Sequence, residues 1–348
     1  MNDQPHSSNL AFIEARVKEI YGEHYRIARQ ELTEDAFRIA DERVGKLEDK
    51  LMPKILKLEN ALNVFADPAF QFILRDAQLS AAATERDSDY ELLSELLIRH
   101  VQKGEDRKIR AGIRQAVKIV DEIDNDALCG LTVAHAFEKF VPQPGTCAEG
   151  LKRLNDIFNS IMYRDLPTGF DWIDHLDSFK AIRIVPQLFG AKMQKVLDYY
   201  RNQVNGYLCV GINISSDDYK SALQLLDSIG IGSNGLVPNE CLNGYVRLPI
   251  ANSNAVNDLY FEIETERVPL NCEQKQILRQ IWGMYSQDSH LKKQVEDSFM
   301  KIYDSFDALR TFRLWWENIQ QPFSITLIGR ILAHTNAKRC DSTLPDLP

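Results

Sequence analysis

Four short amphipathic segments between Asp67 and Val141 constrain the fold more than any other part of the chain. In each segment, apolar residues recur at steps of three and four, which places them on one face of a helix. Polar turns separate the segments. Helices this short are marginal in water unless their apolar faces are buried. The stretch therefore predicts four helices that pack together as a core over residues 67–141.

Local signals place several ends of these helices. Asp67 and Pro68 start the first helix, because a proline at the first helical position loses no hydrogen bond. The third helix is expected to run over residues 105–123 and the fourth over residues 126–140. Two prolines and a glycine within residues 142–145 then break the chain, and we place a domain boundary there.

The preceding residues, 1–66, predict a long helical arm. Apolar residues recur at steps of three and four from Val44 onward, behind an expected N-cap at Thr33. A continuous helix over residues 33–65 would be about 50 Å long at 1.5 Å per residue. Pro53 should bend or break this helix. Its stripe predicts either an arm folded back on its own domain or a seam with a second copy of the chain.

The C-terminal part, residues 146–340, is expected to be mostly helical, with a small α+β insert at about 206–265. Residues 207–214 are rich in β-branched and aromatic side chains and predict a strand. Residues 341–348 are expected to form a disordered tail. Further strands are expected over 245–250 and 259–263, and helices over 215–229, 272–287, 290–303 and 305–319, with a last helix capped by Ser324. The predicted fold class is mainly α: a multi-helix bundle with a long N-terminal helical arm and a small α+β insert in the C-terminal half.

The composition is that of an ordinary folded chain. Of its 348 residues, 44% are hydrophobic and 26% charged, and the length suggests two domains or one large domain. The net charge of −9 argues against a general nucleic-acid-coating protein. Neither a signal peptide nor an apolar run long enough to span a bilayer is visible, so we expect a cytoplasmic protein without membrane insertion. The six cysteines show no C-x-x-C spacing, which favours reduced thiols.

Several residue sets resemble reactive sites but lack the required context. Gly230, Gly232 and Gly235 spell G-x-G-x-x-G, yet a helix is expected before them and a proline-containing loop after them, the reverse of a dinucleotide site. Other sets are more simply polar faces or core histidines: Asp171, Asp174 and His175; Cys129, His135 and Glu138 with Cys147; Glu262, Glu264 and Glu266; and His334 beside Asn336. We therefore expect no cofactor and no metal, and we assign no catalytic residue.

A positive stripe on the third core helix is the most distinctive surface feature. Four residues at three- and four-residue steps form this basic stripe: Arg107, Arg110, Arg114 and Lys118. Arg99 and Lys103 lie just before it. Such a stripe can contact a phosphate, a nucleic-acid backbone or an acidic partner. The alternative is a solvated face that pairs with four nearby carboxylates: Glu85, Asp87, Asp89 and Glu91.

Two parts of the chain resemble a known bacterial family. LTEDAFRIADERVGKLEDKLMPKI and then ADPAFQFILRDAQLSAAATERDSDYELLSELLIRHV are similar to the family catalogued under the paired labels LPO and Vpar. The C-terminal ITLIGRILAHTNAKR is similar to the small-residue and histidine-containing closing helix of that family. The resemblance covers about half of the chain and is strongest over residues 33–140. It implies a bacterial cytoplasmic protein and no particular activity.

These observations favour binding over catalysis. We expect a non-enzymatic interaction or regulatory protein, in a bacterial stress or antiviral defence setting, that binds an acidic partner or nucleic acid through the basic stripe. A protein partner or a second copy would bind the helix over 33–65. One alternative is a hydrolase with a site between the helical body and the 206–265 insert, and another is a self-assembling helical scaffold.

Overall fold

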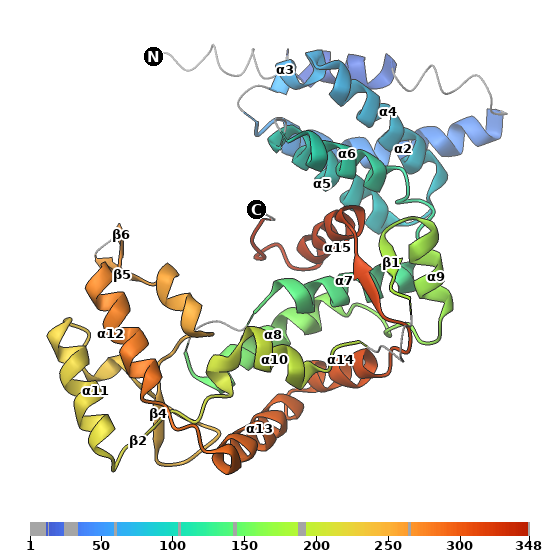
Figure 1. The fold of residues 1–348 in the computed structure, drawn as a ribbon. Helices are drawn as coiled ribbons and strands as arrows, with labels where there is room; N and C mark the ends of the chain where they lie inside the picture. The colour runs from blue at the N-terminus through green and yellow to red at the C-terminus, as the bar shows by residue number, and fades with distance from the viewer. Residues whose placement is uncertain are drawn as a thin grey trace, which may run out of the picture. The chain divides into compact units, whose positions relative to one another are not determined.

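The computed structural model describes residues 12, 14–23, 34–58, 61–103, 106–141, 145–186, 193–263 and 266–346. The chain folds into two compact units. Unit 1 contains Met1–Ala136, Tyr163–Gln187 and Gln321–Pro348, and unit 2 contains Phe137–Met162 and Leu188–Gln320. Each unit thus combines segments from both halves of the chain, whereas the predicted division separates them at residues 142–145. The predicted fold class is confirmed, because the protein is mainly α-helical with a few short strands (Figure 1).

The N-terminal helices of unit 1 fold back on the core. Helix α2 (Glu34–Ile55) ends two residues after Pro53, and α3 (Ala61–Ala66) follows, so the single helix over 33–65 does not form. The expected N-cap, Thr33, lies outside the described residues. Helix α2 packs on α4 (Pro68–Ala83) and α5 (Asp87–Gln102). Its stripe is buried there: Ala40, Val44, Leu47, Leu51, Met52 and Ile55. The structure therefore shows the folded-back arm.

The four predicted core helices are present as α4, α5, α6 (Arg107–Val117) and α7 (Asn125–Lys139). Asp67 caps α4 by accepting a hydrogen bond from the Ala69 N–H, and Pro68 is the first helical residue, as predicted. Asp106 caps α6 in the same way. Helix α6 ends at Val117, six residues earlier than predicted, and turns fill the rest of that stretch.

The C-terminal helix α15 (Leu327–Cys340) completes unit 1 by packing on α5 and α6. Strand β7 (Phe323–Ile325) comes directly before it and pairs with β1 (Ile182–Ile184) in a two-stranded antiparallel sheet. Helix α9 (Asp171–Ser178) precedes β1 in the chain. The predicted cap Ser324 is wrong, because Ser324 lies in β7 and Thr326 caps the helix. A Cβ at Gly329 would lie 2.0 Å from the Ala181 carbonyl oxygen, so glycine permits this close approach.

The segment after α15 corrects the expected disordered tail over 341–348. The structure describes residues 341–346, and Leu344 is only 5% exposed. The His334 ring lies against the Pro345 carbonyl, and Lys338 pairs with Asp346. The buried Leu344 side chain and these two polar contacts therefore hold this segment on unit 1.

Unit 2 has an aromatic helical core. It contains α8 (Cys147–Ile161), α10 (Val196–Gln203), α13 (Ser289–Asp304) and α14 (Asp307–Glu317). Their packed rings are Phe158, Tyr199, Tyr200, Phe299, Tyr303, Phe312 and Trp316, with Phe137 from the end of α7.

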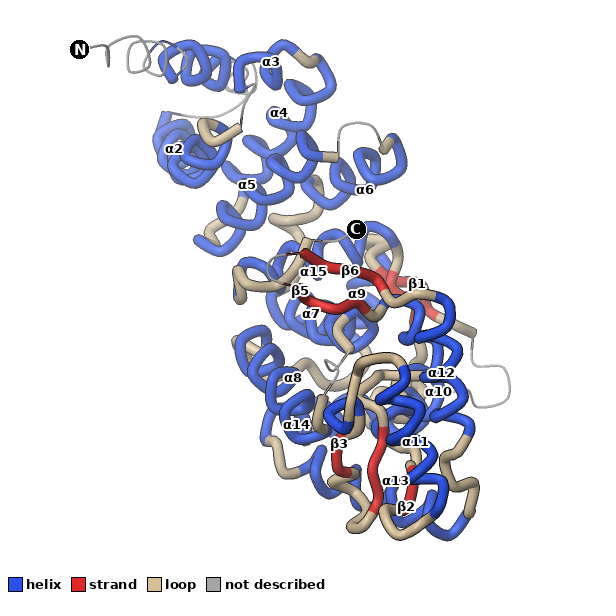
Figure 2. The backbone as a smooth tube through the Cα atoms, turned by 90° about the vertical axis from the view of Figure 1, so that its left-hand side faces the viewer, coloured by secondary structure: helices blue, strands red, loops and turns tan. Residues whose placement is uncertain are grey.

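A small α+β part joins this core, as predicted (Figure 2). Its three-stranded sheet has the order β2-β4-β3, and a separate hairpin pairs β5 with β6. The elements are β2 (Ile212–Asn213), α11 (Asp217–Ser228), β3 (Val237–Pro238), β4 (Tyr245–Arg247), β5 (Tyr260–Ile263), β6 (Glu266–Pro269) and α12 (Cys272–Gly283), with 3-10 turns at Asn205–Tyr207, Ser233–Gly235 and Ser253–Asp258.

The strand predicted over 207–214 is largely wrong, because only Ile212–Asn213 is extended and paired. The Gly206 N–H bonds to the Ala251 carbonyl within a 3-10 turn, and a Cβ at Gly206 would lie 1.9 Å from the Ile250 carbonyl oxygen. Gly211 has a φ of 82°, which interrupts extended backbone. Within the described residues of both units, no helix combines the length and apolar character that a bilayer crossing requires.

Candidate functional site

The basic stripe lies on the side of α6 that faces away from its buried residues. Ile113, Ala116 and Val117 are buried, and α15 packs closely against Gly112, where an added Cβ would lie 2.7 Å from Ile331 Cδ1. These contacts anchor the helix on one side. The stripe is consequently fixed in orientation by the core beneath it.

Two stripe residues, Arg114 and Lys118, contact the Asp76 carboxylate of α4. Arg75, also on α4, contacts the same carboxylate. Arg114 Nε lies 3.2 Å and Lys118 Nζ 3.7 Å from Asp76 Oδ2, and Arg75 Nη2 lies 3.9 Å from Asp76 Oδ1. The Asp76 side chain is 9% exposed, whereas the three cations are each about half exposed. One carboxylate for three cations leaves a local surplus of positive charge on the surface.

Exposed apolar side chains adjoin these cations. Phe72 is 51% exposed, and its ring centroid lies 5.7 Å from Arg75 Cζ and 5.9 Å from Arg114 Cζ. Leu79, seven residues later on α4, is 45% exposed. This spacing places it on the same helix face as Phe72 and Arg75. We call this region the α4–α6 surface, defined by Phe72, Arg75, Leu79, Arg114 and Lys118.

The other two stripe residues lie elsewhere. Arg107 is exposed at the start of α6, and Arg110 is half-buried. Arg110 lines a mainly apolar hollow of about 240 Å³ together with His100 and Phe70. Burial lowers the pKa of His100, and the positive charge of Arg110 lowers it further. The four residues of the stripe therefore do not form one continuous site.

The carboxylates proposed to neutralise the stripe pair with other cations. They contact residues of α2 and the turn before α5 instead: Glu85 with Arg43, Asp87 with Lys46, Glu91 with Lys50 and Lys54, and Asp89 with Arg86. The alternative of a stripe paired with these four carboxylates is thus wrong. The carboxylate that does meet the stripe, Asp76, comes from α4.

Several other predicted sets have structural roles. His175 Nε2 accepts a hydrogen bond from the Asp124 N–H at 2.9 Å, consistent with a polar helix face. Gly230 and Gly232 have positive φ values and lie in turns between α11 and β3, as the turn interpretation requires. Within the residues that the structure describes, no group of three or more His, Cys, Asp or Glu is placed to hold a metal ion. Glu264 lies outside the described residues.

Sequence reasoning found Arg114 and Lys118 but missed their partners Phe72, Arg75 and Asp76. Phe72 and Leu79 interrupt the polar face of α4, and exposed apolar residues seven apart on a helix are a detectable signal. The sequence does not show which neighbouring helix this face adjoins. The packing of α4 beside α6 supplies that information.

The fold and this surface define a mainly α-helical protein with a cationic, partly apolar helix surface. A family model matches residues 13–345. The chain therefore belongs to the uncharacterised family catalogued under the paired labels LPO and Vpar. No curated protein and no solved structure matches the chain.

Proposed function

We propose that the protein is a non-enzymatic interaction protein that binds an acidic segment of a protein partner on the α4–α6 surface. The observation that carries the proposal is the single Asp76 carboxylate shared by three half-exposed cations beside an exposed phenylalanine. From the family resemblance alone, we place this role in a bacterial cytoplasm.

The chemistry of the surface favours a protein segment over a nucleic acid. Arginine and aromatic residues are enriched in protein interfaces. Leu79 adds an exposed aliphatic side chain on the same face of α4. The net charge of the whole chain is −9, which disfavours general attraction to a polyanion. A segment that alternates carboxylates with apolar side chains matches these features.

The proposal can be tested with a fluorescein-labelled synthetic peptide that alternates glutamate and leucine, by fluorescence anisotropy. The double variant Arg114→Glu, Lys118→Glu reverses two charges at the Asp76 carboxylate, so we expect the dissociation constant to rise about tenfold or more. Phe72→Ala should weaken binding by removing the apolar contact. Circular dichroism of each variant checks that it remains folded.

Arg107→Glu is the matched control, because Arg107 is an exposed stripe residue on the same helix but outside the Asp76 contacts. We expect it to leave peptide binding nearly unchanged. If the double variant binds as tightly as the unmodified protein, the α4–α6 surface is not the site. Tighter binding of a labelled single-stranded oligonucleotide than of the peptide would contradict the acidic-protein assignment.

A further inference from the structure

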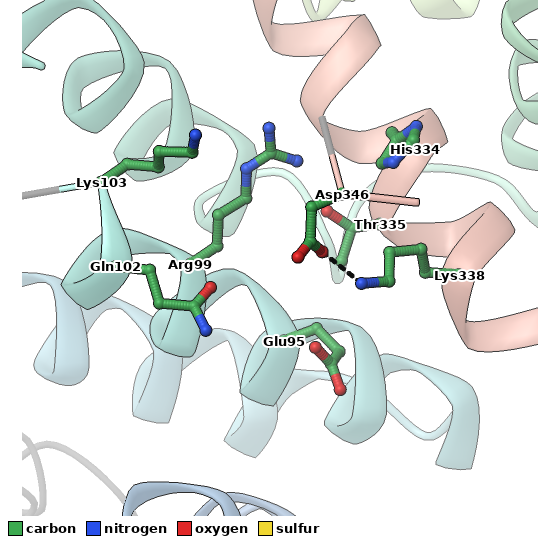
Figure 3. Close-up of a pocket in the computed structure, with 8 residues that line it drawn as sticks. All are labelled: Glu95, Arg99, Gln102, Lys103, His334, Thr335, Lys338 and Asp346. Carbon is green, nitrogen blue, oxygen red and sulfur yellow. Dashed lines mark hydrogen bonds and ion pairs between the residues drawn. The ribbon is translucent and has the colours of Figure 1, made fainter. Parts of the chain in front are cut away.

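A second group of cations surrounds a pocket between α5 and α15, within unit 1. Helix α5 and its C-cap supply Glu95, Arg99, Gln102 and Lys103, and α15 supplies His334, Thr335 and Lys338 (Figure 3). The pocket has a volume of about 270 Å³. Asp346, from the segment after α15, also lines it.

Asp346 places a carboxylate among the cations of this pocket. It pairs directly with Lys338, and in Figure 3 its side chain lies between Lys338 and Arg99. The bond with Lys338 lowers the pKa of Asp346, and the positive charge of Arg99 contributes in the same direction. Burial lowers the pKa of the Arg99 guanidinium, whereas Asp346 raises it. The pocket therefore already stabilises one anionic group.

The charges of the pocket exceed what this carboxylate can neutralise. Arg99, Lys103 and Lys338 carry three positive charges, and the other carboxylate, Glu95, is paired with Lys54 at 2.6 Å. With Asp346 in place, about two positive charges stay uncompensated. An oxyanion with two negative charges would neutralise more of this positive charge than a carboxylate does.

A pair of buried histidines orders the segment that carries Asp346. His334 Nε2 lies 2.8 Å from the Pro345 carbonyl oxygen, which can only accept a hydrogen bond. In neutral His334 the proton is therefore on Nε2, and Nδ1 accepts from His135 Nε2 at 3.3 Å. This chain of hydrogen bonds fixes the backbone next to Asp346. The carboxylate is thus positioned both by the backbone that His334 holds and by its own pair with Lys338.

We propose that the pocket between α5 and α15 is a binding site for a phosphomonoester, and that Asp346 is the chain's own competing anion. A phosphomonoester has a second pKa of about 6 and so carries close to two negative charges at neutral pH. It would bind Arg99, Lys103 and Lys338 after the Asp346 side chain moves out. The group can belong to a free small molecule or to a phosphorylated residue of a partner.

The test measures binding of phosphoserine, of a phosphoserine peptide, of its unphosphorylated form and of glutamate by isothermal titration calorimetry. We expect phosphoserine to bind and glutamate to bind at least about tenfold more weakly. Asp346→Asn removes the competing charge and should tighten phosphoserine binding several-fold. Arg99→Gln and Lys338→Gln should each weaken it in the Asp346→Asn background, where Lys338 has no carboxylate partner to lose.

Lys301→Gln is the matched control, because Lys301 is an exposed basic residue in the last turn of α13. If basic residues served only to stabilise helix C-termini, Lys338→Gln and Lys301→Gln would act alike and neither would alter binding. That result, or undetectable phosphoserine and phosphopeptide binding by Asp346→Asn, would overturn the proposal. Equal affinity for glutamate would overturn the phosphomonoester assignment. Binding of the phosphopeptide but not of free phosphoserine would support the site and identify a partner as the source.

Discussion

His100 shows how the basic stripe affects the core at the scale of a single residue. Its ring is buried near Phe70 at the end of α5, and Arg110 of the stripe faces it. Burial and then the charges of Arg110 and Arg114 lower the pKa of His100, while Asp67 opposes them. The folded protein therefore favours neutral His100.

We expect the folded protein to lose stability as the pH falls through the ordinary histidine pKa of about 6.5. The sign follows because the folded-state pKa of His100 lies below the unfolded one, so the unfolded state binds the extra proton first. His100→Gln should lose less unfolding free energy than the unmodified protein between pH 7.5 and pH 5. Urea unfolding at both pH values measures this, and equal losses in the two proteins would contradict it.

At the scale of single elements, α2 provides the clearest test of packing. The sequence predicted its stripe but left open whether the stripe faces its own domain or a second copy. In the structure, Leu47 is fully buried where α2 packs on α4 and α5. Local periodicity shows which face is apolar, and only the tertiary arrangement shows what covers that face.

Leu47→Ala should lower the unfolding free energy by about 2–5 kcal/mol, because it leaves a cavity in this packed layer. Ile39→Ala, at a 42% exposed position on the same helix, should change it by no more than about 0.5 kcal/mol. Urea unfolding gives both values, and light scattering reports the oligomeric state. Dissociation of an oligomer by Leu47→Ala, without loss of monomer stability, would instead support the seam with a second copy.

The sequence predicted most helices because their signals are local. Asp67 and Pro68 mark the start of α4, and an apolar stripe marks α2. The pairing of β1 with β7 was not predictable, because it joins Ile182 to Ile325, far apart in the chain. The strand over 207–214 failed for a similar reason: its composition favours a strand, but contacts of Gly206 with residues 250 and 251 impose a turn.

The same distinction applies to the α4–α6 surface. Arg114 and Lys118 were predicted from helical spacing alone. The Asp76 carboxylate that joins them to Arg75 comes from another helix, and no pattern within α6 indicates it. Helical spacing therefore predicted the charged face, and helix packing determined which part of that face adjoins α4.

At the scale of the whole molecule, unit 1 depends on segments that are distant in sequence. Helix α15 contributes buried Ile331, Leu332 and Ala333, and β7 completes the sheet with β1. The helices that cover the predicted core thus lie outside residues 67–141, since α2 and α15 both pack on α5. Such coverage is a non-local property that hydrophobic periodicity does not encode.

A chain that ends at Gln320 should therefore lose the native packing of unit 1 while unit 2 keeps its own core. Trp172 reports on unit 1, because it is buried and its ring centroid lies 5.6 Å from that of Phe323, which this truncation removes. Trp282, Trp315 and Trp316 belong to unit 2.

The emission of Trp172 is obtained by subtracting the spectrum of the matching Trp172→Phe variant. We expect this emission to shift to longer wavelength in the truncated chain, whereas a chain ending at Cys340 should show a much smaller shift, because it keeps β7 and α15. An unchanged Trp172 emission in the shorter chain would mean that residues before 321 suffice to fold unit 1.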